Sequence, residues 1–218
     1  RIRAQLTIAG AAGTVLSTQD NVYYATGFSS VMDGWRLAEP IAAVFVPTDA
    51  RLPVVLILPE ASVISLIVSE RGGHPVFYDR LATFEMLNFC ETARAEDAHL
   101  ALPADLLREL GEVLERVEGK CMPDIIQTIA ASVSRHLAKN DLVLFDDLRV
   151  AARVEALTGQ STDDALEAMF AARAVKTKNE LAILRESGQI ADDIMAYTIS
   201  QLGVGKSWSE VERQVAHF

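Results

Sequence analysis

The stretch Asn21-Val22-Tyr23-Tyr24-Ala25-Thr26-Gly27-Phe28 carries the most information about the fold. It follows an apolar segment, residues 14–17, that we expect to be a short buried strand. An Asn at the start of a turn can hydrogen-bond its own backbone, and Gly27 tolerates a positive φ angle. The aromatic side chains of the stretch would contribute core contacts. By themselves, these residues predict a turn that builds the fold and has no catalytic role.

A second informative segment begins about 150 residues downstream, with the sequence Arg173-Ala174-Val175-Lys176-Thr177-Lys178-Asn179-Glu180-Leu181. Apolar residues recur at helical spacing from Glu180 to Leu202, so we expect one long helix there. The glycines of Gly203-Val204-Gly205 would end that helix. Ser207-Trp208-Ser209-Glu210 has the pattern of a capping box and predicts that a further helix starts at Trp208.

Together the two segments resemble the amino-terminal domain of the creatinase and Xaa-Pro peptidase family, the pita-bread metallohydrolases. In that family an Asn-x-x-Tyr-x-Thr/Ser-Gly-Phe turn follows the first strand. An Arg-x-x-Lys-x-x-x-Glu-Leu/Ile segment then opens the long helix that leads into the catalytic domain. The matching residues are Asn21, Tyr24, Thr26, Gly27 and Phe28 in the first segment, and Arg173, Lys176 and Glu180 in the second. The resemblance covers nearly the whole chain.

Between these segments, apolar runs alternate with amphipathic ones, which is typical of an α/β domain with a mixed sheet flanked by helices. We expect strands at residues 14–17, 41–46, 53–58, 75–78 and 142–145, and helices at 2–9, 61–70, 104–120, 123–137 and 149–157. With the resemblance, residues 1–165 are predicted to be a creatinase-like amino-terminal α/β domain. Residues 166–218 would be a connecting segment and the first helices of an incomplete pita-bread catalytic domain. The polar residues 160–164 precede this join.

The resemblance implies that the intact protein is a metal-dependent hydrolase of amide or peptide bonds. Two Asp, one His and two Glu in a half beyond Phe218 would hold two divalent ions, often manganese, cobalt or zinc. A bridging hydroxide would attack the scissile amide. This chain would be a non-catalytic part, inactive alone, that covers the active site and builds a homodimer interface. We expect it to be a fragment, because it begins with Arg1 and stops shortly after a helix starts.

The segment Asp33-Gly34-Trp35-Arg36 is a second candidate for function, on a loop expected to be exposed. An Arg offers a planar fork for a carboxylate, and a Trp offers a large apolar face that also attracts cations. In creatinase-like members an aromatic residue and an Arg from the corresponding loop reach the neighbouring subunit's active site. The resemblance therefore implies that Trp35 and Arg36 bind substrate in trans. The alternative is a loop Trp that packs on its own domain.

Composition excludes several other classes. The chain has 218 residues, 50% of them hydrophobic, and a formal net charge of −10, which argues against a nucleic-acid surface. Its apolar runs are too short to span a bilayer, so we expect no membrane partner. Cys90 and Cys121 stand far apart without a CxxC pattern, and we interpret them as reduced thiols of a cytoplasmic protein.

Other motifs have both a functional and a structural interpretation. Asp146-Asp147 after a strand could bind a divalent cation, but capping the next helix is the simpler role for an Asp. Gly205-Lys206-Ser207 resembles the end of a phosphate-binding loop, yet Ser200 stands where that pattern needs glycine and a helix precedes it. The four histidines have no zinc-site spacing.

Two rival functions remain open from the sequence. The chain could be a binding or assembly module whose parent has lost its metal ligands. A nucleotide-binding α/β domain is a further alternative, disfavoured because no complete glycine fingerprint occurs. The substrate, an Xaa-Pro peptide, creatine or another amide, does not follow from the residues.

Overall fold

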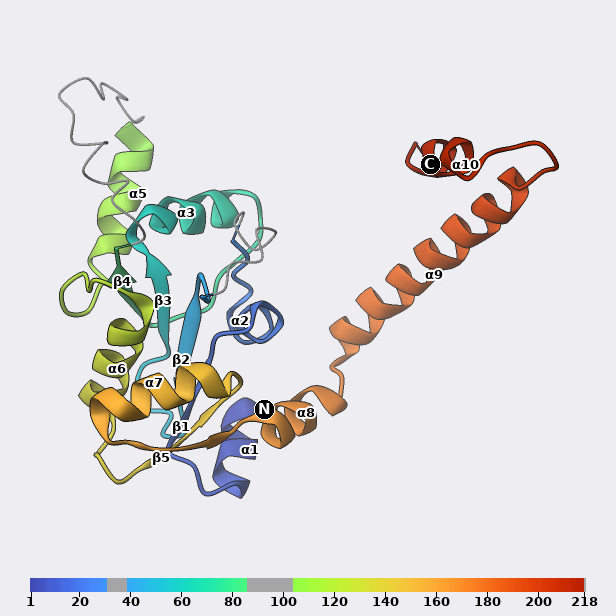
Figure 1. Cartoon of the computed structure of the whole chain (residues 1–218). Coiled ribbons are helices and arrows are strands. Elements are labelled where there is room, and N and C mark those ends of the chain that lie inside the picture. The colour runs from blue at the N-terminus through green and yellow to red at the C-terminus, as the bar shows by residue number, and fades with distance from the viewer. Residues whose placement is uncertain (31–38, 86–103, 218) are drawn as a thin grey trace. The chain divides into compact units, whose positions relative to one another are not determined.

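The computed structural model describes residues 1–30, 39–85 and 104–217. The chain forms two compact units, Arg1–Ala172 and Arg173–Phe218. Figure 1 labels helices and strands of both units.

A mixed β-sheet forms the centre of the first unit (Figure 1). In the described ranges its six strands lie in the order β4-β3-β2-β1-β5-β6. The pairs β1–β2 and β2–β3 are antiparallel, whereas β3–β4, β1–β5 and β5–β6 are parallel. The strands are β1 (Gly13–Leu16), β2 (Ala43–Pro47), β3 (Val55–Pro59), β4 (Arg80–Phe84), β5 (Leu142–Phe145) and β6 (Ser161–Asp164). The predicted α/β fold with a mixed sheet is confirmed.

Helices cover both faces of this sheet, which explains why β1, β2 and β3 are buried along their whole length. Successive residues of β2 alternate between two cores: Val44 and Val46 join one, and Ala43 and Phe45 join the other. The second core is closed by α6 (Ile125–His136) and α7 (Leu148–Thr158). The first core is closed by α1 (Ile2–Ile8), α2 (Gln19–Thr26), α3 (Val63–Arg71, after a short 3-10 turn, Glu60–Ser62), α5 (Ala104–Leu114) and α8 (Leu166–Ala174).

Local capping signals set the bounds of the helices on the second core. Asp124 precedes α6, and its carboxylate accepts a hydrogen bond from the Gln127 backbone N–H at 2.8 Å. The helix therefore begins at Ile125, two residues after the predicted start at Pro123. Asp147 caps α7 in the same way, and Gly159 ends that helix with a φ of 66°. Both of the predicted α7 ends are confirmed within one residue.

The predicted strand at residues 75–78 is wrong. The Phe77 backbone N–H donates to the Thr26 carbonyl at 2.7 Å, so this segment bonds to the end of α2. The sheet strand β4 begins two residues later, at Arg80, where it pairs with Val55. The apolar pattern of 75–78 reflects Val76, which is buried in the first core.

The helix predicted for residues 104–120 is also wrong in its last part. Helix α5 ends at Leu114, and the chain then runs beside β4. There the Glu118 N–H donates to the Leu81 carbonyl at 2.7 Å, and the Met122 N–H donates to the Thr83 carbonyl at 3.0 Å. Residues 116–122 thus cover the outer edge of β4, because sheet hydrogen bonds replace the helical ones.

Of the polar residues 160–164, expected to precede a join, Ser161–Asp164 form β6 at the opposite edge of the sheet. Gln160 is buried, and its side-chain amide donates to the carbonyls of Ala138 and Asp141. In β6 the Asp163 carboxylate accepts from the Asp164 N–H at 2.8 Å. Polar composition here marks an edge strand and not a linker.

The second unit contains α9 (Lys178–Gln201) and α10 (Trp208–Val215). The predicted capping box of Ser207 and Glu210 is confirmed, with the Ser207 N–H donating to the Glu210 carboxylate at 2.8 Å. No residue of α9 is buried. Among the residues described, no helix combines the length and the apolar character that crossing a membrane requires.

Limited proteolysis tests this arrangement. We expect proteinase K to cut the purified chain first at residues 202–207, between α9 and α10, because this segment lacks sheet pairing. The hydrogen-bonded strand β6 should resist. Intact-mass measurement of the early fragments locates the cuts, and early cleavage within 161–164 would contradict the pairing of β6.

Candidate functional site

Most of the Asn21–Phe28 stretch belongs to helix α2, which Gly27 caps at its carboxyl end. The turn expected at Asn21 is therefore wrong. Asn21 lies in the first turn of α2, and its side-chain amide donates to the Asp146 carboxylate at 3.0 Å. Asp146 follows β5, 125 residues further along the chain. The Asn side chain therefore joins two distant elements.

Asp146 accepts five hydrogen bonds from the described part of the chain. The Ser17 N–H and hydroxyl donate to one carboxylate oxygen at 2.8 and 3.1 Å. The other oxygen accepts from the Thr18 N–H at 3.1 Å, from the Thr18 hydroxyl at 2.6 Å and from Asn21. Hydrogen bonds to a carboxylate are about twice as strong as neutral ones, so this cluster clamps the start of α2 to the end of β5.

The cluster lies where open α/β sheets commonly bind ligands. The parallel strands β1 and β5 are neighbours, and the helices that follow them, α2 and α7, pack on opposite faces of the sheet. Such a topological switch point usually leaves a crevice at the carboxyl ends of the strands. Here the chain's own carboxylate and its donors meet at that place, so the switch point serves the fold.

The cation site considered at Asp146-Asp147 does not form. Asp147 accepts from the Arg149 N–H at 2.9 Å and pairs with its guanidinium at 2.7 Å. This Arg149 side chain and N–H hold the pKa of the Asp147 carboxyl below its usual value. Within the ranges 1–30, 39–85 and 104–217, no three His, Cys, Asp or Glu side chains gather as a metal site would require. The described residues thus do not fit a dinuclear centre.

Thr26, Gly27 and Phe28 close the end of α2. The Thr26 hydroxyl donates to the Val22 carbonyl at 2.7 Å and accepts from the Phe28 N–H at 3.0 Å. Gly27 has a φ of 77°, and a Cβ there would lie 2.9 Å from the Pro75 carbonyl oxygen. A glycine is therefore required both by the left-handed conformation and by the close approach of the backbone. Phe28 is 2% exposed and fills the first core.

The second motif lies around the start of α9. Thr177 caps this helix, its hydroxyl accepting from the Glu180 N–H at 3.2 Å while the Glu180 carboxylate accepts from the Thr177 N–H. The Thr-x-x-Glu spacing is a capping-box signal that our sequence interpretation missed. Arg173 lies in the last turn of α8, and Lys176 is exposed between the two helices.

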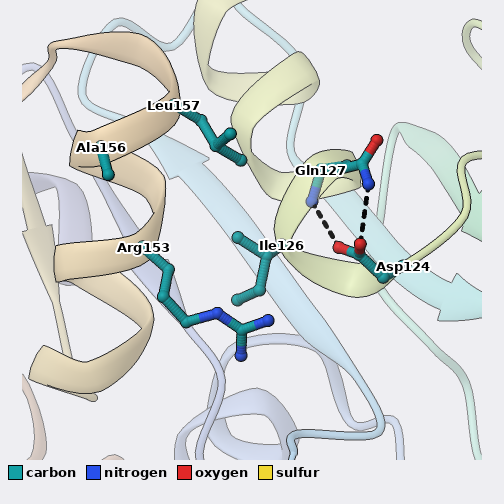
Figure 2. A pocket seen from close by; sticks show the side chains of 6 residues that line it. All are labelled: Asp124, Ile126, Gln127, Arg153, Ala156 and Leu157. Atoms are coloured by element: carbon teal, nitrogen blue, oxygen red, sulfur yellow. Dashed lines mark hydrogen bonds between the residues drawn. The ribbon is translucent and has the colours of Figure 1, made fainter.

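A shallow hollow of about 320 Å³ lies between the start of α6 and α7, as Figure 2 shows. The Asp124 carboxylate at its rim is engaged by the backbone and side-chain amides of Gln127, both at 2.8 Å. The residues that line it are Asp124, Ile126, Gln127, Arg153, Ala156 and Leu157. These side chains include no hydroxyl, thiol or histidine, and their one carboxylate, that of Asp124, is already bound by both amides of Gln127, so the hollow does not pair a nucleophile with a histidine base.

Comparison with known proteins identifies the fold. No model of a protein family matches the chain, and no curated protein does. Among solved structures, a prolidase from Pyrococcus furiosus matches 99% of this chain and 50% of its own, with a TM-score of 0.57 and 15% identity. A prolidase from Thermococcus sibiricus matches 99% and 47%, with a TM-score of 0.59 and 16% identity. The dipeptidase PepE from Mycobacterium ulcerans matches 99% and 46%, with a TM-score of 0.57 and 17% identity.

The chain has the creatinase-like amino-terminal fold. This confirms the predicted fold class and the resemblance noted in the sequence. The chain spans about half the length of the prolidases that it matches. Identities near 15% establish this fold alone, so substrate and activity are matters for proposal.

Within this creatinase-like fold, Trp35 and Arg36 lie outside the described residues. The described chain resumes at Glu39, whose carboxylate accepts two hydrogen bonds from the Arg153 guanidinium at 2.5 and 2.7 Å. Arg153 is on α7, so this ion pair joins Glu39 to that helix. The role of Trp35 and Arg36 in substrate binding stays a prediction.

Replacing Asp146 by Asn tests the clamp of the creatinase-like fold. The new amide group would face donors that now meet a carboxylate, so we expect a loss of about 2–3 kcal/mol in the free energy of unfolding. Asp147→Asn is the matched control, because Asn is an equally good helix cap and should cost less than about 1 kcal/mol. Urea unfolding followed by circular dichroism measures the free energy of unfolding of both variants. Equal losses would contradict the clamp, because Asp146 would then stabilise the fold no more than the helix cap Asp147 does.

Proposed function

We propose that this chain is the non-catalytic amino-terminal part of a metal-dependent amide or peptide hydrolase that resembles Xaa-Pro peptidases and creatinase. The supporting observation is the match of 99% of the chain to about half of a prolidase. In this proposal the chain covers the active site of a cytoplasmic homodimer that cleaves a small peptide or amide. Two divalent ions, manganese, cobalt or zinc, belong to a catalytic half outside residues 1–218.

The exposed surface of α9 supports the proposal that this chain packs against a separate catalytic half. Large apolar side chains recur along this helix and are between 38% and 62% exposed. They include Leu181, Leu184, Ile194, Met195 and Ile199. An apolar stripe of this kind on a soluble helix usually packs against another surface. In the proposal, that surface is the catalytic half, and residues 166–218 are a connecting segment followed by its first helices, α9 and α10.

The coding sequence beyond Phe218 is the direct test. The proposal requires two Asp, one His and two Glu there, in that order, because these residues would hold the metal ions. Their absence from a long downstream region would favour the alternative, a binding or assembly module whose parent has lost its metal ligands. Neither outcome changes the assignment of the fold.

The purified 218-residue chain should not hydrolyse Xaa-Pro dipeptides or creatine, with or without manganese. The described residues supply no cluster of metal ligands from which such activity could arise. Equilibrium dialysis with Mn²⁺, Co²⁺ and Zn²⁺, followed by metal analysis, should give less than one tightly bound ion per chain. Manganese-dependent turnover by this chain would overturn its non-catalytic assignment.

The proposal gives Trp35 and Arg36 the task of binding substrate at the partner subunit's active site. A guanidinium forms two parallel hydrogen bonds with a carboxylate, such as that of a small peptide or of creatine. The indole face would pack against the apolar part of the substrate. A loop suits this role, because it can extend beyond the domain that carries it.

Arg36→Ala in the longer protein should lower kcat/KM by about 30-fold or more, because losing a desolvated Arg–carboxylate contact costs about 2–5 kcal/mol. Arg36→Lys should restore only part of this loss, since Lys keeps the charge without the fork. Arg51→Ala is the matched control, because Arg51 is 90% exposed on the β2–β3 turn and pairs only locally with Asp49. Near-wild-type kinetics for Arg36→Ala would remove Arg36 from the site.

Subunit mixing tests whether Arg36 acts in trans. Arg36→Ala subunits are mixed with subunits that lack a metal ligand in the catalytic half. If Arg36 serves the partner's site, each heterodimer contains one intact site, so activity should return on mixing. No recovery despite demonstrated subunit exchange would refute the trans arrangement.

A further inference from the structure

A groove of about 400 Å³ lies at the border of the first core, where α8 begins. Leu142 and Leu144 of β5 line it from the sheet. Ala9, which follows α1, and Leu166 and Ala168 of α8 line it from the helices. The groove thus lies within the first unit, between elements that the core holds in place.

The charged side chains that line this groove are all acidic: Asp163, Asp164 and Glu167. Asp163 pairs with Leu144 in the register of β5 and β6, so the two side chains lie on the same face of the sheet. The Asp163 and Asp164 carboxylates accept backbone N–H groups at 2.8 and 2.7 Å, which leaves them further acceptor positions. None of the ion pairs between described residues involves these three carboxylates. A cationic group is therefore their electrostatic complement.

Large apolar side chains stand exposed along the same helix. Leu166 is 56% exposed and Phe170 is 68% exposed. Four residues separate them, so they lie on one face of α8, a turn apart. A small cation in the groove would leave Phe170 in water, whereas a peptide segment could cover both side chains. Apolar surface that continues beyond a groove in this way is typical of protein contacts.

We propose that this groove docks a basic peptide segment of a partner protein. Apolar side chains of the segment cover Leu166 and Phe170, and its Lys or Arg side chains meet the carboxylates of Asp163, Asp164 and Glu167. The segment contacts the first-core side of the sheet and the start of α8, so docking needs no added strand. This inference concerns the first unit alone and does not depend on the proposed hydrolase function.

Fluorescence anisotropy with the labelled peptide Lys-Leu-Phe-Lys-Lys tests the charge complement. The purified 218-residue chain is used at about 0.15 M salt, where attraction between exposed charges is screened beyond about 8 Å. Asp163→Asn combined with Glu167→Gln should weaken binding about fivefold, a factor in the range expected for two exposed ion pairs. The Asn side chain can still accept from the Asp164 N–H, so circular dichroism should show an unchanged fold.

The matched control removes the same charge from the other side of the sheet. Glu60, which follows β3, and Glu115, which precedes the segment beside β4, are both exposed. Glu60→Gln combined with Glu115→Gln should leave the affinity unchanged. An equal loss in this control would overturn the proposal, because the net charge of the chain would then attract the peptide without a site.

A second pair of variants tests the apolar contact. Leu166 and Leu148 are each the first residue of a helix, and each is 56% exposed. Leu166→Ser should weaken peptide binding about fivefold, since the apolar area that the peptide covers is lost. Leu148→Ser should bind as the parent does, because α7 packs on the opposite face of the sheet. Equal affinities of the parent and Leu166→Ser would refute docking at this groove.

Two competitors separate the peptide from other occupants. If n-butylamine displaces the peptide at equal concentration, the groove is a site for small cations and the proposal is wrong. Binding by the 218-residue chain that disappears in the longer protein would also overturn it, because another part of that protein would then cover the groove. The same peptide with Glu in place of Lys should not bind, and its binding with equal affinity would refute the charge complement.

Discussion

The first unit depends on a single carboxylate. Asp146 directly follows β5. Its carboxylate accepts hydrogen bonds from backbone N–H, hydroxyl and amide groups of the residues that follow β1. This contact joins the two parallel strands at the centre of the sheet and sets where α2 begins. Because α2 starts there, Gly27 meets the 75–77 segment and Tyr24 meets α8. The carboxylate of Asp146, which the sequence offered as a possible cation ligand, thus stabilises the fold.

Elements that depend on their own residues could be predicted from the sequence. The apolar run Leu142–Phe145 is a strand with the predicted bounds, because burial on both sheet faces leaves no polar residue in it. Gly159 and the Ser207 capping box end and begin helices as predicted, since both act within a few residues. The creatinase-like fold could be inferred because its two motifs preserve such local geometry together with their order.

Predictions failed where a residue's partner is far away in the sequence. Asn21 is a residue type that is typical of turns, but its side-chain amide donates to the Asp146 carboxylate, 125 residues further along the chain. Residues 116–122 continue a helical pattern, yet β4 offers them better hydrogen bonds. The polar residues of β6 lack the apolar pattern of a strand because an edge strand faces water on one side, so no strand was predicted there. The substrate-binding role of Trp35 and Arg36 was inferred through the resemblance, and it stays a prediction.

Both outer edges of the sheet are protected against pairing with another strand. Beyond β4, residues 116–122 already occupy the hydrogen-bonding positions. At β6, Asp163 binds the neighbouring Asp164 N–H, and two adjacent negative charges repel an approaching acidic strand. In the described part of the chain, these two features disfavour association by extension of the sheet. The described helices and loops are then the surfaces left for contact with another protein, and the sheet serves as the frame that carries them.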